Sequence, residues 1–125
     1  MISYDEFKKV EIRAGKILSA EKIPDTDKLL KLSVDFNETA QVAALEPEGV
    51  PTMVPKHRTI VSGIALYFPD PQTLVGKTCM FVTNLEPRVI RGHESNGMIF
   101  AVSGPDGAFS LLEPQVPIPP GSLAG

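Results

Sequence analysis

The stretch that decides the fold is LLKLSVDF, residues 29–36, in which apolar and polar side chains alternate. Successive side chains of a β-strand point to opposite faces, so this pattern predicts a strand with one buried face. The apolar face is formed by Leu30, Leu32, Val34 and Phe36. The opposite face is formed by Leu29, Lys31, Ser33 and Asp35.

The preceding segment, VEIRAGKILSAEKI at residues 10–23, predicts a long first strand that bends. Its alternation slips at Ile17 and Leu18, and Gly15 lies just before the slip. A glycine at such a point is typical of a β-bulge. Before this strand, Ser3 and Glu6 form a capping-box pattern that predicts one or two helical turns.

The rest of the chain predicts short elements separated by turns. Residues 39–57 hold three prolines and a glycine without a sustained period, which indicates a long loop or an insertion. The other expected elements are a turn at 24–27, strands at 58–65, 78–84, 97–102 and 108–112, a short helix at 70–77 capped by Asp70, a loop at 85–93, and an extended C-terminal segment at 113–125.

This order of elements predicts an all-β fold in one domain over residues 1–125. Five or six short strands, with one short helix between the third and the fourth, are typical of an OB-fold, a five-stranded Greek-key barrel.

Composition limits the classes of protein that the chain can belong to. A single cysteine, Cys79, excludes a disulfide framework and a thiol-based zinc cluster. No stretch resembles a signal peptide or is long enough to span a bilayer, so we expect a cytoplasmic protein without a membrane partner. The net charge of −3 argues against a protein that coats nucleic acid by bulk charge.

Catalytic and metal-binding patterns are nearly present but incomplete. Gly76-Lys77-Thr78 ends like a phosphate-binding loop, but Pro71 stands where that motif needs a glycine. His57 and His93 have no cysteine or carboxylate at ligand spacing, so exposed or structurally bonded histidines are the favoured interpretation. We therefore expect no catalytic residue, no metal site and no cofactor.

The basic residues suggest a surface for a polyanion. An OB barrel binds its ligands on the face of the second and third strands and on two flanking loops. The candidate residues on that face are Lys28, Lys31, Arg58, Arg88 and Arg91. Ordinary solvated charges are the alternative interpretation of these residues. Few aromatic residues are expected there, which favours recognition of a folded RNA's shape over stacking of single strands.

Three ordered segments carry a family resemblance: DEFKKVEIRAGKILSAEKIPDTDKLLKLSVDF (5–36), VSGIALYFPDPQTLVGK (61–77) and NLEPRVIRGHESNGMIFAV (84–102). They resemble the tRNA-binding domain family, which occurs as free-standing bacterial proteins and appended to methionyl-tRNA synthetase and other synthetases. The resemblance implies an OB-fold, a homodimer, and recognition of the outer corner of L-shaped tRNA. It implies tRNA contacts at Lys28, Lys31, Arg88, Ser95 and Met98, with a position in the core as the alternative for Met98. Asn84 is a further candidate contact, and with Pro87 and Gly97 it also matches the motif as a residue that shapes the loop.

Two features depart from the family's pattern, and two other functions stay open. The insertion at 39–57 and the acidic charge balance are the departures. The charge balance motivates the first alternative, a module that docks to a synthetase or dimerises. The apolar segment from Val50 to Val54 motivates the second, an export-related, chaperone-like peptide binder.

Overall fold

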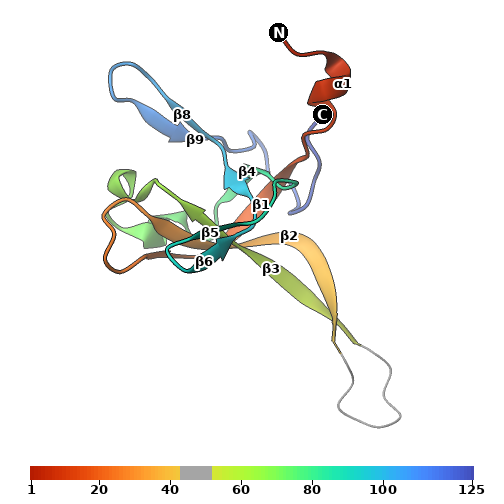
Figure 1. Cartoon of the computed structure of the whole chain (residues 1–125), viewed down its shortest axis with the longest axis horizontal. Coiled ribbons are helices and arrows are strands. Elements are labelled where there is room, and N and C mark those ends of the chain that lie inside the picture. Colours follow the sequence, from red (N-terminus) through yellow and green to blue (C-terminus); the bar gives the residue numbers. More distant parts are fainter. Residues whose placement is uncertain (43–51) are drawn as a thin grey trace.

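The computed structural model describes residues 1–42 and 52–125, and strands dominate it (Figure 1). The strands are β1 (Ile12–Lys22), β2 (Leu30–Val42), β3 (Thr52–Ser62), β4 (Thr78–Val82), β5 (Arg88–Ile90), β6 (His93–Ser95), β7 (Met98–Ile99), β8 (Ala101–Ser103) and β9 (Phe109–Leu111). The helical elements are α1 (Tyr4–Phe7) and the 3₁₀ turns η1 (Ala65–Tyr67) and η2 (Pro71–Leu74). The turns η1 and η2 lie between β3 and β4, where the sequence predicts the short helix.

Five strands form one antiparallel sheet in the order β3-β2-β1-β4-β7. The sheet curls, and residues just before β7 bond to β3 at its other end. The Asn96 amide donates to the Thr59 carbonyl at 2.8 Å, and the Val61 amide donates to Ser95 Oγ at 2.9 Å. These bonds bring the two ends of the sheet together, and the predicted all-β, OB-type barrel is confirmed.

The predicted apolar face of residues 29–36 lines the core. Leu30, Leu32 and Val34 are fully buried, and the Phe36 ring meets Phe81 edge-on with centroids 5.2 Å apart. Burial of four such side chains on one strand stabilises the fold by roughly 1.5–3 kcal/mol each. Lys31 and its neighbours on the opposite face remain partly exposed.

The predicted irregularity of the first strand is confirmed. The pairing of β1 with β2 shifts register between Ile17 and Ser19, so Leu18 is the extra residue of a bulge. Gly15 is needed because the strands cross closely there. A Cβ at this position would lie 2.7 Å from Val34 Cγ1 and closer still to Phe36.

Substitution of Gly15 with alanine is expected to lower the free energy of unfolding by about 1–2 kcal/mol, because the added methyl overpacks the core. Urea denaturation followed by circular dichroism measures the change. Gly63→Ala is the matched control, since nothing lies within 4 Å of a Cβ there. Equal stability of both variants would contradict the close approach at Gly15.

The expected loop at residues 39–57 is wrong for the part that the structure describes. Residues 39–42 continue β2 and residues 52–57 belong to β3, with Thr39 opposite Pro55. The two strands leave the barrel as a ribbon (Figure 1). Pro55 fits because β3 lies at the edge of the sheet, where a missing N–H costs no ladder bond. The middle of the expected loop, residues 43–51, lies outside the described residues.

The expected loop at residues 85–93 is also wrong, because β5 and β6 form a hairpin. Ile90 pairs with His93 across the two residues Arg91 and Gly92, both with positive φ, of 51° and 81°. This is the geometry of a type I′ turn, which sequence reasoning assigns to Asn-Gly rather than Arg-Gly. The strand expected at 97–102 is interrupted at Phe100, between β7 and β8.

The C-terminal segment runs beside the first half of β1. The Ala14 amide donates to the Ser122 carbonyl at 2.9 Å, and the Ala124 amide donates to the Ile12 carbonyl at 2.8 Å. These bonds satisfy backbone groups of β1 in the stretch before its pairing with β2 begins at Lys16.

Candidate nucleic-acid interface

Lys31 and Arg88 lie in one row across four strands. Lys31 pairs with Val61 of β3, the Val61 amide donates to Ser95 Oγ of β6, and Ser95 pairs with Arg88 of β5. β5 and β6 form a separate two-stranded sheet, and the bond from Val61 to Ser95 places this hairpin beside β3. We call Lys28, Lys31, Arg88 and Arg91 the basic row; Lys28 precedes β2 and Arg91 lies in the hairpin turn.

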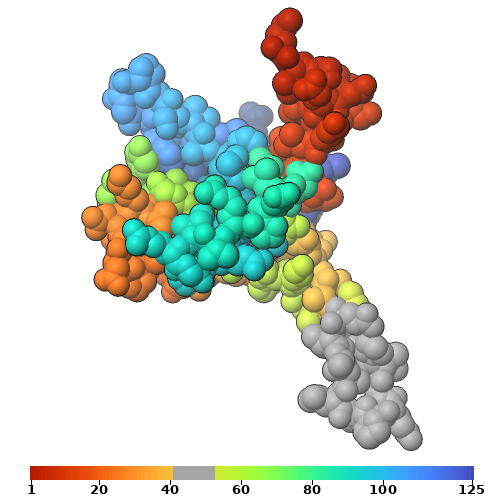
Figure 2. All heavy atoms as spheres, viewed as in Figure 1, coloured from red at the N-terminus to blue at the C-terminus, as the bar shows by residue number. Residues whose placement is uncertain are grey.

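The basic row is accessible but not purely cationic. Lys28, Arg88 and Arg91 are exposed, and Figure 2 shows residues 20–30 in orange and the β5–β6 hairpin in teal on the same visible face. Acids stand among the cations. Lys31 Nζ lies 3.8 Å from Glu21 Oε1, and Glu94 follows His93 on β6. An exposed pair at this distance contributes little to stability, so Lys31 can exchange Glu21 for another anion.

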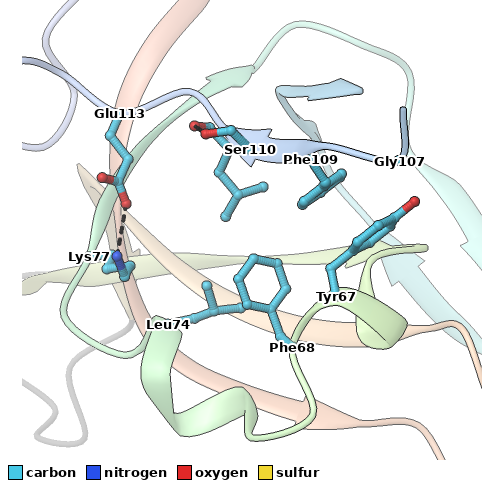
Figure 3. Close-up of a pocket in the computed structure, with 9 residues that line it drawn as sticks. Tyr67, Phe68, Leu74, Lys77, Gly107, Phe109, Ser110 and Glu113 are labelled. Atoms are coloured by element: carbon cyan, nitrogen blue, oxygen red, sulfur yellow. Dashed lines mark hydrogen bonds and ion pairs between the residues drawn. The ribbon is translucent and has the colours of Figure 1, made fainter. Parts of the chain in front are cut away.

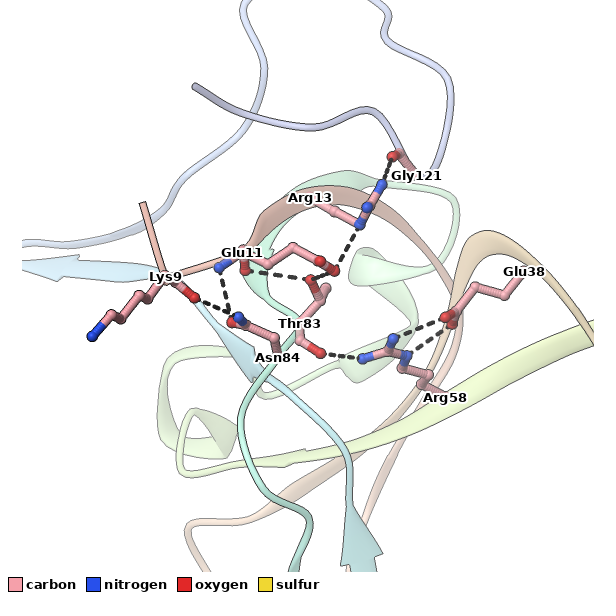
Figure 4. Close-up of polar contacts among 8 residues, drawn as sticks. All are labelled: Lys9, Glu11, Arg13, Glu38, Arg58, Thr83, Asn84 and Gly121. Atoms are coloured by element: carbon pink, nitrogen blue, oxygen red, sulfur yellow. Dashed lines mark hydrogen bonds and ion pairs between the residues drawn. The ribbon is translucent and has the colours of Figure 1, made fainter. Parts of the chain in front are cut away.

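The expected position of Arg58 on this face is wrong. Arg58 pairs with the buried Val34, so it points to the opposite side of the sheet from Lys31. Its guanidinium makes two 2.8 Å bonds to the Glu38 carboxylate and a 2.6 Å bond to the Thr83 carbonyl (Figure 4). Its side chain is only 13% exposed and lies over the Phe36 ring. Arg58 therefore links β2, β3 and the end of β4.

A second set of polar contacts holds the segment that leads into β1 (Figure 4). Thr83 Oγ1 donates to the Glu11 carboxylate at 2.7 Å, and Arg13 Nε donates to the same carboxylate at 2.8 Å. Asn84 Oδ1 accepts from the Glu11 amide, while its Nδ2 donates to the Lys9 carbonyl. The Asn84 amide group thus serves the fold at this position.

Sequence reasoning missed Glu38 and Thr83 as the partners of Arg58. The pairing of β2 with β3 shifts register between Asp35 and Glu38, where Asn37 has a φ of 59°. Residue alternation alone does not reveal this bulge, and the bulge is what brings Glu38 to Arg58.

The carboxylates of Glu38 and Glu11 in these networks should make the fold less stable at acidic pH. The hydrogen bond from Arg58 holds the pKa of Glu38 below its usual value of 4.5, and hydrogen bonds from Arg13 and Thr83 lower the pKa of Glu11. A carboxylate with a lowered pKa stabilises the fold above its unfolded pKa, and this stabilisation is lost as the pH falls through the folded pKa.

We therefore expect the free energy of unfolding to be insensitive to these two groups above about pH 6 and to fall below about pH 5. Urea unfolding at pH 7, 5, 4 and 3.5 measures it. The Glu38→Gln variant should be less stable at pH 7 and should lose less stability on acidification. An identical pH dependence in the variant would show that Glu38 has no such role.

Ser95 and Met98 differ in accessibility. Ser95 is 4% exposed and its hydroxyl accepts from the Val61 amide, so it holds the hairpin to β3. Met98 is 46% exposed on β7, opposite Val82. The alternative placement of Met98 in the core is therefore wrong, and its thioether lies on the surface three residues beyond Ser95.

Other reactive groups are few in the described part of the chain. Burial raises the pKa of the Cys79 thiol to about 11, so at neutral pH it is not a thiolate nucleophile. No group of three potential metal ligands occurs in residues 1–42 and 52–125. Over the same ranges, every helix is too short to cross a bilayer.

Comparison with known sequences identifies the family. The family described as "Putative tRNA binding domain" matches residues 12–123. Methionine–tRNA ligase of Methanoregula boonei is 46% identical over 123 residues, and that of Enterococcus faecalis is 35% identical over 121 residues. These matches cover 98% and 97% of the chain but only 15% and 16% of the two enzymes. The chain thus corresponds to a small part of the curated relatives.

Solved structures agree with this assignment. A MetRS-related protein from Pyrococcus horikoshii superposes with a TM-score of 0.80 at 35% identity, covering 100% of this chain and 98% of that one. The CsaA chaperone of Picrophilus torridus has a TM-score of 0.75 at 24% identity over the whole of both chains, a likeness of fold. The chain belongs to the tRNA-binding domain family and is related to methionyl-tRNA synthetase.

Proposed function

We propose that the chain is a non-catalytic module that binds tRNA by its shape, as a homodimer, and that it acts alone or with a methionyl-tRNA synthetase in the cytoplasm. The observation that carries the proposal is the family match over residues 12–123 together with an accessible basic row. A match to about 15% of the relatives' length fits a module that holds tRNA near an active site located elsewhere.

In this proposal the basic row supplies affinity and the barrel supplies position. Lys28, Lys31, Arg88 and Arg91 neutralise phosphates, and each contact releases condensed counterions. Met98 offers an adaptable apolar contact at the border of the row. Asn84, Arg58 and Ser95 stabilise the fold instead, because their hydrogen bonds fix the loop after β4, the ribbon and the β5–β6 hairpin.

The dimer rests on exposed apolar side chains near both termini. Tyr4, Phe7 and Leu123 are exposed, and they line a cavity of about 410 Å³ between α1 and the last residues. Two copies that share this surface would bury it and would double the number of cations presented to one RNA. Light scattering of the purified chain should report twice the mass of the monomer.

The two alternatives are weighed by specific observations. The acids beside the basic row favour the docking module, in which RNA contact is incidental. The CsaA likeness is one of fold and does not assign peptide binding to this chain. Val50 and Pro51 of the segment that motivated peptide binding lie outside the described residues, whereas residues 52–54 belong to β3, where Met53 is exposed.

A titration against three ligands separates these functions. The ligands are intact tRNA, an unfolded RNA of equal length, and an apolar peptide, each at low and at physiological salt. Tighter binding of intact tRNA supports the proposal. Indifference to all RNA at low salt would overturn it in favour of docking, and preference for the peptide would favour the chaperone-like role.

A further inference from the structure

An aromatic pair joins the turn η1 to the strand β9. The rings of Tyr67 and Phe109 are stacked, with centroids 3.8 Å apart and an interplanar angle of 6°. Phe68 meets Phe109 edge-on at 6.0 Å, and both of these phenylalanines pack against the core. Tyr67, however, is 51% exposed. Phe109 covers one face of the Tyr67 ring, and about half of the Tyr67 surface stays accessible.

The position of Tyr67 connects it to the basic row. The Ala65 amide donates to the Lys28 carbonyl at 3.0 Å, which ties the turn η1 to the residues just before β2. Tyr67 is two residues beyond that bond. The turn that carries Tyr67 is thus bonded to the Lys28 end of the basic row.

A cavity lies beneath the pair, and its lining includes no residue of the basic row. It has a volume of about 460 Å³ and lies between the η1–η2 segment and β9 (Figure 3). Lys77 and Glu113 bond to each other at 3.1 Å beside Leu74, whereas the Tyr67 hydroxyl points away from Leu74 toward Gly107 (Figure 3). The paired charges offer no net attraction to an anion. Lys28 is exposed, and its backbone is bonded to the turn η1 that carries Tyr67.

We propose that the open face of Tyr67 stacks on an unpaired base of the bound RNA, with Lys28 beside the adjoining phosphate. This inference rests on the proposed function and adds one contact to it. Every nucleobase has a flat face, so an exposed aromatic ring next to a cation suits single-stranded RNA segments such as the loops of a folded tRNA. Packing of the β8–β9 hairpin explains Phe109 and Phe68, but it does not require a half-exposed tyrosine.

Tyrosine fluorescence tests the contact directly, because the chain has two tyrosines and no tryptophan. In the Tyr4→Phe variant Tyr67 is the sole emitter, and in the Tyr67→Phe variant Tyr4 on α1 is the sole emitter. Intact tRNA should quench Tyr67 emission, and the tRNA concentration at half-maximal quenching should equal the midpoint of the tRNA-binding curve. Tyr4 emission should fall only by the amount that results from light absorption by the added RNA. Equal changes in both variants would overturn the inference.

Affinity provides the second measurement. Tyr67→Ala should weaken tRNA binding by about 5- to 20-fold, as expected for one stacked base, and Tyr67→Phe should stay within about twofold of the unaltered chain. The salt dependence should not change, since no charge is removed. If the unaltered chain binds tRNA and Tyr67→Ala binds it equally well, the stacking inference is contradicted and the proposed function is not. If the unaltered chain does not bind tRNA, the proposed function fails.

Discussion

Substitution of Lys31 and Arg88 together with glutamine is expected to weaken tRNA binding by about 30-fold to several hundredfold, or about 2–4 kcal/mol. Each residue should contribute about 1–2 kcal/mol through its phosphate contact. The contributions should add, because the two side chains lie on different strands and share no partner. Both side chains are accessible and neither belongs to the core, so thermal stability should not fall.

The matched control is Glu21→Gln, which removes the acid 3.8 Å from Lys31. This change should strengthen tRNA binding by about two- to threefold, the opposite direction, because it removes a competing anion. A gel-shift titration at fixed salt measures all three proteins. A double variant that binds tRNA like the unaltered chain would show that the basic row is not the interface.

Substitution of Arg58 with alanine is expected to lower the free energy of unfolding by about 2–3 kcal/mol without changing tRNA affinity at temperatures where the variant is folded. The change removes three hydrogen bonds and leaves the Glu38 carboxylate, only 30% exposed, without its cation. The penalty is smaller than for a fully buried pair because Glu38 keeps some water.

Urea denaturation measures this loss, and Arg13→Ala is the control. The Arg13–Glu11 pair has the same 2.8 Å contact but a cation that is 34% exposed, so its loss should cost less than about 1 kcal/mol. Arg58→Lys should recover only part of the stability, because an ammonium cannot form the bidentate bond. An Arg58→Ala protein that keeps full stability but binds tRNA more weakly would contradict this account and show that Arg58 belongs to the interface.

The sequence predicted the barrel well because its strands are patterned by burial. The alternation at residues 29–36 and the slip after Gly15 both report which side chains face the core, and both were confirmed. The short helix was predictable for a local reason: Asp70 caps η2 by accepting from the Gln72 amide at 3.1 Å.

The elements that the sequence missed depend on pairing rather than on local pattern. The extensions of β2 and β3 pair with each other outside the barrel, so no buried face marks them, and Pro55 argued against a strand. The β5–β6 hairpin turns at Arg91-Gly92, where the arginine adopts a φ of 51° that the residue type does not suggest.

The candidate site was predicted in part for the same reason. Placing Lys31 and Arg88 in one row requires the bond from Val61 to Ser95, residues 34 apart in the chain. The position of Arg58 off that row follows from its pairing with Val34, and the bulge before Glu38 supplies its acidic partner. The stacking of Tyr67 on Phe109 joins two segments whose separate sequences carry no sign of contact.

The most direct test of an interface built on the basic row is the salt dependence of tRNA binding. Equilibrium binding is measured between 50 and 300 mM KCl for the unaltered chain and for the protein with both Lys31→Gln and Arg88→Gln. We expect a steep loss of affinity with salt for the unaltered chain and a slope shallower by about 1.4–1.8 for the double variant, since each lost phosphate contact removes about 0.7–0.9. Equal slopes for the two proteins would contradict the account.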